Sequence, residues 1–391
     1  MASIWAEGNV SNSCYAVTWV WCMIEPEVFI MHQDILDLYA EYLLSSFGRT
    51  TATGLAELLD GAVSHDRVTR WLSSEARSSK DLWRVVKPLV REIESDDGVL
   101  IFDDSIEEKP YTDENDIICW HYDHSKDRTI KGINFLTALY SSRGVNLPVA
   151  FELVAKTEQY VDPKSGKQKR RSSVTKNEHY RNMLKVCAGN QLRFRYVLND
   201  SWYASAENMM FVKHQIKRDF IMALKSNRKV ALSAADKAAG RYQVISTLDL
   251  PAGTLREVYL ESVDFPLLLT KQVFTNEDGS TGILYLVTSD LTLDYTRLTT
   301  IYQERWQVEE YHRSLKQNAS LAKSPTRTVT TQTNHFFAAL CAYVKLERLR
   351  SGTKLNHYAL KTKLYVAALQ SAFEQLQTMQ PFRFASLEAS A

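Results

Sequence analysis

The chain has few cysteines, no long apolar run and no basic start. Its 391 residues include five cysteines, an odd number, and no C-x-x-C pair occurs, so the sequence indicates neither a disulfide framework nor a structural zinc site. Residues 1–25 contain no Lys or Arg, whereas a signal peptide begins with basic residues and continues into an apolar run. We therefore expect a protein of the reducing cytoplasm without a membrane-spanning segment.

The chain also lacks an excess of charge of either sign. Forty-seven Lys and Arg residues balance 46 Asp and Glu residues, so the net charge of +1 points to no class of partner. Hydrophobic residues at 45% and charged residues at 24% are near globular averages, which excludes disordered and collagen-like proteins. At roughly 100–200 residues per domain, this length predicts two or three structural units.

The N-terminal quarter of the chain is predicted to be helical, except for its first 25 residues. Residues 1–25 have poor periodicity, and we expect them to be an extension outside the fold. From residue 26 to about residue 96, apolar residues recur at three- and four-residue spacings, which predicts a series of helices. Within this region, residues 64–72 are compatible with a recognition helix carrying Arg67 and Arg70, or with an ordinary amphipathic helix whose arginines are solvated.

Two short apolar runs further along the chain end in acids. Residues 99–102 are followed by Asp103 and Asp104, and residues 196–199 are followed by Asp200. Continuous apolar runs of this length are typical of buried central strands.

The remaining patterns complete the prediction of an α/β fold. Residues 135–141 and 149–154 predict antiparallel strands joined by a turn that contains glycine. Residues 219–290 alternate short β segments with turn signals, which predicts an all-β insertion. Helix is predicted again from Tyr295 through Lys316, and two more helices within residues 331–376.

Three acids are candidates for one metal site. Asp103 and Asp200 stand at strand ends, and Glu309 lies on the downstream helix. Three converging carboxylates can hold two divalent metals about 3.5–4 Å apart, an arrangement used for in-line attack on phosphodiesters. Carboxylate oxygens favour Mg²⁺ or Mn²⁺ over zinc. The alternative is that the two aspartates serve as ordinary turn residues.

The helix that carries Glu309 has an unusual polar stripe. Tyr302, Arg305, Glu309 and Lys316 fall within about 60° of one another at 100° per residue. One stripe thus combines a phenol, two cations and an acid, which suits a metal-bound phosphodiester: the acid binds metal, and Tyr302, Arg305 and Lys316 are the candidates for binding its phosphates. A solvated face with Arg305 paired to Glu309 is the alternative.

These residues resemble a known signature. Tyr302, Arg305, Glu309 and Lys316 reproduce the Y-(2)-R-(3)-E-(6)-K pattern of cut-and-paste DDE transposases from bacterial insertion sequences. The sequence Asp-Asp-Ser that begins at Asp103 resembles the first motif of that family, D-x-[ST]. The sequence Asp-Ser-Trp-Tyr that begins at residue 200 is similar to its second motif. The resemblance extends over roughly residues 30–350.

The resemblance implies a fold and an organisation. It implies an RNase H-like catalytic core in two parts, residues 97–218 and 291–330, separated by the β insertion at 219–290. Residues 26–96 would then be a helical DNA-binding region, and residues 331–391 a C-terminal helical tail.

The resemblance also implies an activity. A member of this family would nick and join transposon ends with two Mg²⁺ or Mn²⁺ ions, in some members through a hairpin. Its partners would be double-stranded DNA, at transposon ends and target, and a second copy of the chain on those ends. It would be cytoplasmic and associated with the nucleoid. The alternatives are an RNase H-like nuclease or resolvase that cuts without strand transfer, and a non-catalytic, transposase-derived DNA-binding protein.

Within the resemblance, some residue assignments have alternatives. The first motif selects Asp103, and Asp104 is the alternative. A family aromatic that stacks on a flipped base would fall near Tyr285, although a cross-strand β aromatic is slightly favoured there. Trp306 is a second stacking candidate, but we expect Trp306 and Trp202 to be core residues packed beside the acids.

Basic residues are concentrated in one segment. Residues 156–195 contain eleven Lys and Arg against three acids, a local excess of +8. We expect Lys169, Arg170 and Arg171 to contact the phosphate backbone without reading sequence. The alternative is a solvated loop.

Overall fold

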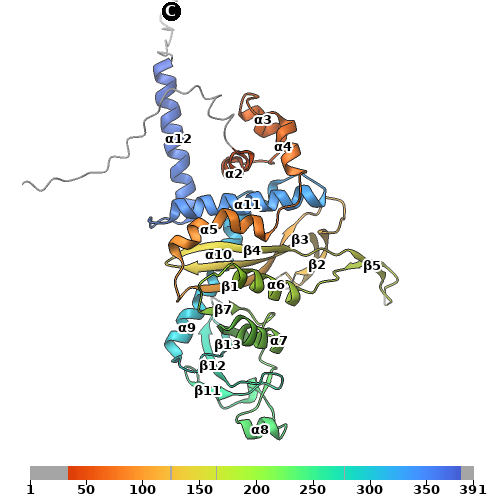
Figure 1. Cartoon of the computed structure of the whole chain (residues 1–391), viewed down its shortest axis with the longest axis vertical. Coiled ribbons are helices and arrows are strands. Elements are labelled where there is room, and N and C mark those ends of the chain that lie inside the picture. Colours follow the sequence, from red (N-terminus) through yellow and green to blue (C-terminus); the bar gives the residue numbers. More distant parts are fainter. Residues whose placement is uncertain (1–33, 124–125, 164, 277, 380–391) are drawn as a thin grey trace, which may run out of the picture.

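The computed structural model describes residues 34–123, 126–163, 165–276 and 278–379 (Figure 1). The extension expected at residues 1–25 lies outside the described residues. The α-helices are α2 (Ile35–Ser45), α3 (Ala52–Leu58), α4 (His65–Leu72), α5 (Ser79–Ile93), α6 (Lys176–Gly189), α7 (Ala206–Met210), α8 (Ala234–Ala238), α9 (Tyr295–Gln303), α10 (Gln307–Gln317), α11 (Val329–Arg350) and α12 (His357–Met379).

The strands are β1 (Val99–Glu108), β2 (Ile118–Asp123), β3 (Arg128–Ser142), β4 (Val145–Leu153), β5 (Glu158–Val161), β6 (Gln168–Arg171), β7 (Tyr196–Asn199), β8 (Asp219–Leu224), β9 (Lys229–Val230), β10 (Gln243–Val244), β11 (Leu255–Val258), β12 (Leu267–Thr275) and β13 (Thr281–Thr288). Nine of them form one sheet, while β5–β6 and β9–β10 are separate two-stranded pairs. The structure is therefore a mixed α/β fold, as the sequence predicts.

The centre of the large sheet has the strand order β4-β3-β1-β7-β8. The pairs β3–β4 and β1–β3 are antiparallel, whereas β1–β7 and β7–β8 are parallel. A tight hairpin joins β3 to β4 through Arg143 and Gly144, whose φ angles of 52° and 73° give the primed turn that fits the twist of two antiparallel strands. Three antiparallel strands followed by two parallel ones fit an RNase H-like core.

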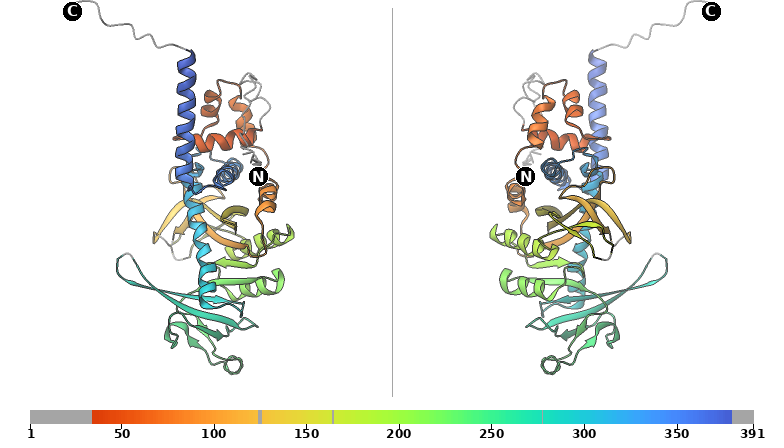
Figure 2. Two further views of the ribbon diagram at one scale, coloured as in Figure 1. Left: turned by 90° about the vertical axis from the view of Figure 1, so that its left-hand side faces the viewer. Right: turned by 90° about the vertical axis from the view of Figure 1, so that its right-hand side faces the viewer.

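The prediction of an all-β insertion at residues 219–290 is not confirmed. Its first strand, β8, pairs in parallel with β7 and so belongs to the central sheet. Strands β13, β12 and β11 then continue the same sheet in antiparallel order, and the segment also contains the short helix α8. Figure 2 shows these strands extending the lower part of the molecule. The alternating pattern identifies strands, but it does not specify which neighbour each strand pairs with.

The N-terminal helices pack on a helix from the far end of the chain. Tyr39 of α2 hydrogen-bonds to His335 of α11 (3.1 Å), and Asn334 of α11 donates to the carbonyl of Leu72 in α4 (3.0 Å). Phe336 of α11 packs against Phe135 of β3, with ring centroids 4.9 Å apart. Helix α11 is thus part of the core rather than of a tail, and Figure 1 shows it lying between α2–α4 and the sheet.

The predicted helix from Tyr295 to Lys316 is present but irregular. Helix α9 passes through a single 3₁₀ turn, Glu304–Trp306, into α10 without leaving the right-handed helical region of φ and ψ. Helix α10 packs against β1, so the helix bearing Glu309 lies beside the strand bearing Asp103. None of the described helices combines the length and apolar character needed to cross a bilayer.

Candidate active site

Strand register places the two aspartates at one edge of the sheet. Phe102 of β1 pairs with Asn199 of β7, which in turn pairs with Met222 of β8, all in parallel. Asp200 directly follows the end of β7, as expected. Asp103 is not at a strand end, because β1 continues to Glu108 alongside β3, but it directly follows the last residue of β1 that pairs with β7. The carboxyl ends of parallel strands are where side chains converge to form sites in α/β proteins.

Asp104 is held by three partners. One carboxylate oxygen accepts from Lys176 Nζ (2.6 Å) and Asn134 Nδ2 (3.0 Å), and the other accepts from the Tyr203 hydroxyl (2.7 Å). Burial alone would raise the pKa of Asp104, but the Lys176 ammonium and these hydrogen bonds outweigh it, so the pKa is lowered. These contacts support a structural role for Asp104 and favour Asp103 as the first metal-binding acid.

The electrostatic environment of Asp103 is opposite to that of Asp104, because negative charges surround it. Its Oδ1 accepts the backbone N–H of Asp104 (2.9 Å). Burial raises the pKa of Asp103 well above the usual range, the carboxylates of Asp104, Asp200 and Glu309 raise it further, and Arg305 opposes them. Asp103 therefore lies where several negative charges gather, which is an electrostatic environment that favours a bound cation.

Glu309 and a histidine complete a compact group with Asp103. Ligand atoms of Asp103, Glu309 and His312 all lie within 4.8 Å of one another, and His312 Nδ1 is 4.0 Å from Asp103 Oδ2. His312 is 6% exposed, and burial lowers its pKa to about 3, so its imidazole is neutral and able to ligate a metal. Sequence reasoning missed His312, although its i+3 position relative to Glu309 places it on nearly the same helix face.

Asp200 is fixed by its own turn. Its Oδ1 accepts the N–H groups of Trp202 (2.9 Å) and Tyr203 (3.4 Å). Burial raises the pKa of Asp200, while these hydrogen bonds and Arg305 lower it. Asp200 is not in the three-residue group within 4.8 Å, but its charge is one of those that raise the pKa of Asp103.

Arg305 and Tyr302 lie beside the acids. Arg305 Nη1 is 3.5 Å from Glu309 Oε1, and the Arg305 side chain is 18% exposed. Burial raises the pKa of Tyr302 to about 12, and its hydroxyl donates to the carbonyl of Asn199 (3.4 Å), the residue before Asp200. Tyr302 therefore holds the helix against the end of β7, and Arg305 is positioned over the acids.

Lys316, the last residue of the predicted stripe, points at the backbone of β1. Its Nζ donates to Ser105 Oγ (2.8 Å) and to the carbonyl of Ile106 (2.9 Å). Burial lowers the pKa of Lys316, and the Glu107 carboxylate partly restores it. In this state Lys316 joins α10 to the strand that carries Asp103.

The expectation that Trp202 and Trp306 are core residues is wrong. Their exposed fractions are 44% and 57%, so both rings reach the surface within three residues of Asp200 and Glu309. Tyr285 is only 6% exposed and pairs across the sheet with Lys271 and Leu224, in agreement with the cross-strand alternative. The sequence shows that Trp202 and Trp306 stand close to the acids along the chain, but it does not show whether each ring is buried or exposed.

The basic hairpin β5–β6 is ion-paired in this state. Lys169 lies 2.5 Å from Asp162, Arg170 2.8 Å from Asp116 and Arg171 2.7 Å from Glu158. Figure 1 shows the hairpin projecting from the side of the molecule. Its cations are exposed or near the surface, but each has an acidic partner within the protein.

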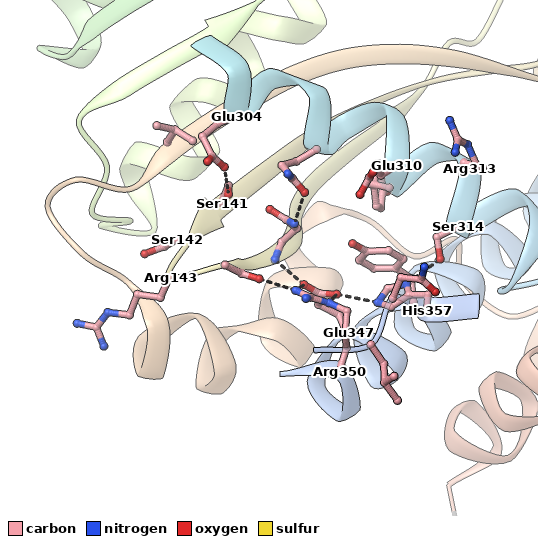
Figure 3. A pocket seen from close by; sticks show the side chains of 18 of the residues that line it. Ser141, Ser142, Arg143, Glu304, Glu310, Arg313, Ser314, Glu347, Arg350 and His357 are labelled. Carbon is pink, nitrogen blue, oxygen red and sulfur yellow. Dashed lines mark hydrogen bonds and ion pairs between the residues drawn. The ribbon is translucent and has the colours of Figure 1, made fainter. Parts of the chain in front are cut away.

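A cavity lies on the other face of α10. Its volume is about 770 Å³, and Glu304, Glu310 and Ser314 point into it, whereas Glu309 does not line it (Figure 3). At its wall Ser314 Oγ lies 2.7 Å from His357 Nδ1, and His357 Nε2 lies 2.7 Å from the buried carboxylate of Glu347. This chain of hydrogen bonds joins α10, α12 and α11, and it helps fix the position of the helix that bears Glu309.

The donor set fits a divalent cation. The carboxylates of Asp103 and Glu309 offer anionic oxygen ligands, which suit Mg²⁺ or Mn²⁺, whereas the His312 nitrogen is a ligand more typical of transition metals. Burial first, and then the neighbouring carboxylates, raise the pKa of Asp103, and a bound cation would relieve the repulsion among these carboxylates.

Comparison with protein families agrees with this geometry. The family model described as DDE superfamily endonuclease matches residues 31–244, more than half of the chain, and a model described as transposase DDE domain matches residues 163–345. The chain therefore belongs to the DDE superfamily of endonucleases and transposases, an enzyme class that acts on DNA and depends on divalent metal. Comparison with curated proteins gives no match.

Proposed function

We propose that this protein is a cut-and-paste DNA transposase that nicks and joins transposon ends at a site formed by Asp103, Asp200 and Glu309. The observation that carries the proposal is the convergence of Asp103, Glu309 and His312 within 4.8 Å from two elements more than 200 residues apart. When bound, two Mg²⁺ or Mn²⁺ ions would supply charge neutralisation and nucleophile activation at the scissile phosphodiester.

The residues of the chain have separate roles in this proposal. Asp103, Asp200 and Glu309 would hold the metals, with His312 as a further ligand candidate. Arg305 would bind a phosphate beside the cleaved bond, since its planar guanidinium can donate two parallel hydrogen bonds to phosphate oxygens. Lys316 would turn from Ser105 to a phosphate when DNA arrives, because both of its present acceptors are neutral. Cleavage through a hairpin is also part of the proposal, with Trp306 as the exposed aromatic on the catalytic helix.

The rival functions differ in the steps after the first cut. An RNase H-like nuclease or resolvase would nick DNA without joining strands, and a transposase-derived binding protein would do neither. The intact acid set argues against the binding protein, because clustered carboxylates weaken DNA affinity unless metal is present.

We also propose a homodimer on the transposon ends, formed through α12. This helix exposes five apolar side chains to between 42% and 61%, those of Leu364, Val366, Leu369, Phe373 and Leu376, and at 100° per residue the last four share one face. In an antiparallel pair of α12 helices centred near Ala368, Lys363 of each copy would face Glu374 of the other, so charge complements the apolar contact. Leu369→Glu should give a monomer on end DNA by light scattering, whereas Leu364→Glu, which makes the same change on the opposite face of α12, should not.

The test of function uses DNA that flanks the gene. Purified protein, Mg²⁺ and a duplex carrying flanking inverted repeats should give 3′-hydroxyl nicks at the repeat ends and, with a target plasmid, joined products. Nicks without joined products would favour the nuclease. Binding without nicks in Mg²⁺ and in Mn²⁺ would favour the binding protein.

A further inference from the structure

Glu107 on β1 is a buried acid that the proposed mechanism does not use. It is 8% exposed, and its carboxylate has neither a hydrogen bond nor an ion pair among the described residues. Burial raises the pKa of Glu107, and the charges of Lys316 and Lys109 oppose that effect. A buried charge without a direct partner is costly to the fold, so we looked for a role of this charge outside stability.

The strand places Glu107 on the same face as the first metal-binding acid. Side chains alternate along a strand, so Asp103, Ser105 and Glu107 share one face of β1. This face meets α10, whose Lys316 contacts Ser105. At about 3.3 Å per residue, Glu107 lies about 13 Å along the strand from Asp103. Glu107 is therefore outside the metal site but next to the position that Lys316 occupies.

The Lys316 ammonium has only neutral hydrogen-bond partners here. Its Nζ donates to Ser105 Oγ at 2.8 Å and to the carbonyl of Ile106 at 2.9 Å. Glu107 follows directly on the chain and forms no ion pair with Lys316, yet after burial its charge has the largest effect on the pKa of Lys316, which it raises. Glu107 thus acts on Lys316 through charge, without a contact that a DNA phosphate would have to break.

The other charges that act on the same ammonium are already paired or neutral. Lys126 forms ion pairs with Glu108 and, at 3.8 Å, with Asp123. His312, one turn earlier on α10, is neutral because burial lowers its pKa to about 3. Glu107 is therefore the acid near this ammonium that no cation of the described chain holds in an ion pair.

Lys109, the second lysine that acts on Glu107, is fixed by other contacts. Its Nζ donates to the carbonyls of Ala322 (2.9 Å) and Ser324 (3.3 Å), and the residue is 6% exposed. Lys109 therefore anchors the loop after α10 to the end of β1. Lys316 is only partly buried, so it is the lysine beside Glu107 that can reach DNA.

We propose that Glu107 is a positioning residue for the proposed reaction: it keeps Lys316 charged and free to reach the phosphate that enters the site. The inference rests on the proposed function, in which Lys316 turns from Ser105 to a DNA phosphate. A buried amine without a counter-charge loses its proton more readily, and a neutral amine cannot neutralise a phosphate. A direct ion pair would preserve the charge but would hold Lys316 away from DNA. A carboxylate just beyond contact avoids both problems.

The test measures the pH dependence of nicking by the full chain. The substrate is the duplex with flanking inverted repeats, in Mg²⁺ between pH 6.5 and 9.5. Glu107→Gln removes the charge and keeps the shape of the side chain. Its alkaline loss of activity should occur about 1 pH unit lower than in the wild type, because Lys316 without its counter-charge deprotonates earlier. At the low end of the range, its rate should approach the wild-type rate.

Two further variants and a stability measurement separate this role from a structural one. Arg is charged at every pH of the test, so Glu107→Gln should cause no shift in a Lys316→Arg background. Glu108→Gln removes the neighbouring charge, which Lys126 already pairs with, and should shift the profile far less. In urea, Glu107→Gln should unfold no more easily than the wild type, because the charge that it removes is buried without a direct partner.

Binding of the same duplex gives a second measurement that does not depend on cleavage, and it decides the question if Lys316→Arg does not nick. The buffer contains Ca²⁺, and fluorescence anisotropy gives the affinity. At pH 9.5, Glu107→Gln should reduce the slope of log affinity against log salt by about 0.9, the value for one phosphate contact, as Lys316→Ala does. At pH 7 its slope should equal that of the wild type.

The outcomes distinguish the role of Glu107 from the proposed function. A pH profile and a salt slope that Glu107→Gln leaves at wild-type values would overturn the role of Glu107 alone. An equal pH shift in the Lys316→Arg background would do the same, as would a uniform loss of activity together with lower stability. A wild type that neither nicks nor binds the duplex would overturn the proposed function as well.

Discussion

The ammonium of Lys176 lies 2.6 Å from the carboxylate of Asp104, while Asp103, one residue earlier on β1, faces the carboxylates of Asp200 and Glu309. Two adjacent aspartates thus have opposite electrostatic environments. Asp104 stabilises the fold when it is charged, whereas a charged Asp103 needs a cation beside it.

This contrast predicts different consequences for the two substitutions. Asp103→Asn should abolish DNA nicking and raise or preserve the free energy of unfolding, because it removes a repelled charge. Asp104→Asn should lower the free energy of unfolding by about 1.5–3 kcal/mol, because it weakens hydrogen bonds to a charged group. Urea unfolding and a nicking assay on the same preparations check both. A stable, inactive Asp104→Asn together with an active Asp103→Asn would exchange the two assignments.

Substitutions of Arg305 and Lys316 should also differ from each other in their effects on stability. Arg305→Ala should unfold like the wild type, since its 3.5 Å pair with Glu309 is long, yet lose about 100-fold in nicking rate on pre-bound DNA. Arg305→Lys should recover little, because a point charge cannot replace a planar fork at a phosphate. Lys316→Ala should lose both activity and about 1–3 kcal/mol of stability, because Lys316 also joins α10 to β1.

Near-normal nicking by Arg305→Ala would show that Arg305 serves only as an ion-pair partner of Glu309. For Lys316, the informative comparison is Lys316→Gln, which can still donate a hydrogen bond to Ser105. If this variant regains stability but not activity, the phosphate role holds. If it regains both, Lys316 acts only on the position of α10.

Glu347 should make the stability of the protein depend on acid pH. Although burial would raise the pKa of Glu347, its bonds to Arg350, His357 and the N–H of Asn146 lower it to about 2, from 4.5. A lowered folded-state pKa means that the stabilisation is complete above pH 4.5 and is lost as the pH falls toward 2, on the order of 3 kcal/mol in total.

The measurement is urea unfolding between pH 2.5 and 6. Glu347→Gln should flatten the acid limb of the stability curve, while Glu310→Gln, on an exposed residue lining the same cavity, should leave it unchanged. An identical acid limb in Glu347→Gln and the wild type would show that other carboxylates dominate acid unfolding.

The hairpin β5–β6 should contribute salt-dependent affinity for duplex DNA. Neutralising Lys169, Arg170 and Arg171 to Gln should weaken binding equally for all sequences and flatten the salt dependence by about 0.9 for each lost phosphate contact. Because each cation already has an acidic partner, the loss should be smaller than for three free cations. An unchanged salt slope would leave the hairpin as a solvated loop with internal ion pairs.

The candidate residues of the site could be chosen from the sequence because the choice depends on residue type and spacing. The apolar runs before Asp103 and Asp200 identify the strands, and helical periodicity places Arg305 on the face of Glu309. Contacts between distant segments were not predictable: the packing of α11 on α2 and α4, and the pairing of Asp104 with Lys176, depend on tertiary arrangement. For the same reason the sequence did not reveal that Trp202 is exposed or that His312 faces Asp103.

The central claim is that Asp103, Asp200 and Glu309 bind the catalytic metal. The most direct test replaces Mg²⁺ with Fe²⁺ and uses ascorbate and peroxide to cut the protein backbone next to the bound ion, with fragments mapped by mass spectrometry. We predict cuts near residues 103, 200 and 309 that excess Mg²⁺ suppresses and that Asp103→Asn removes. Suppressible cuts confined to other segments, with none near these three residues, would contradict the account.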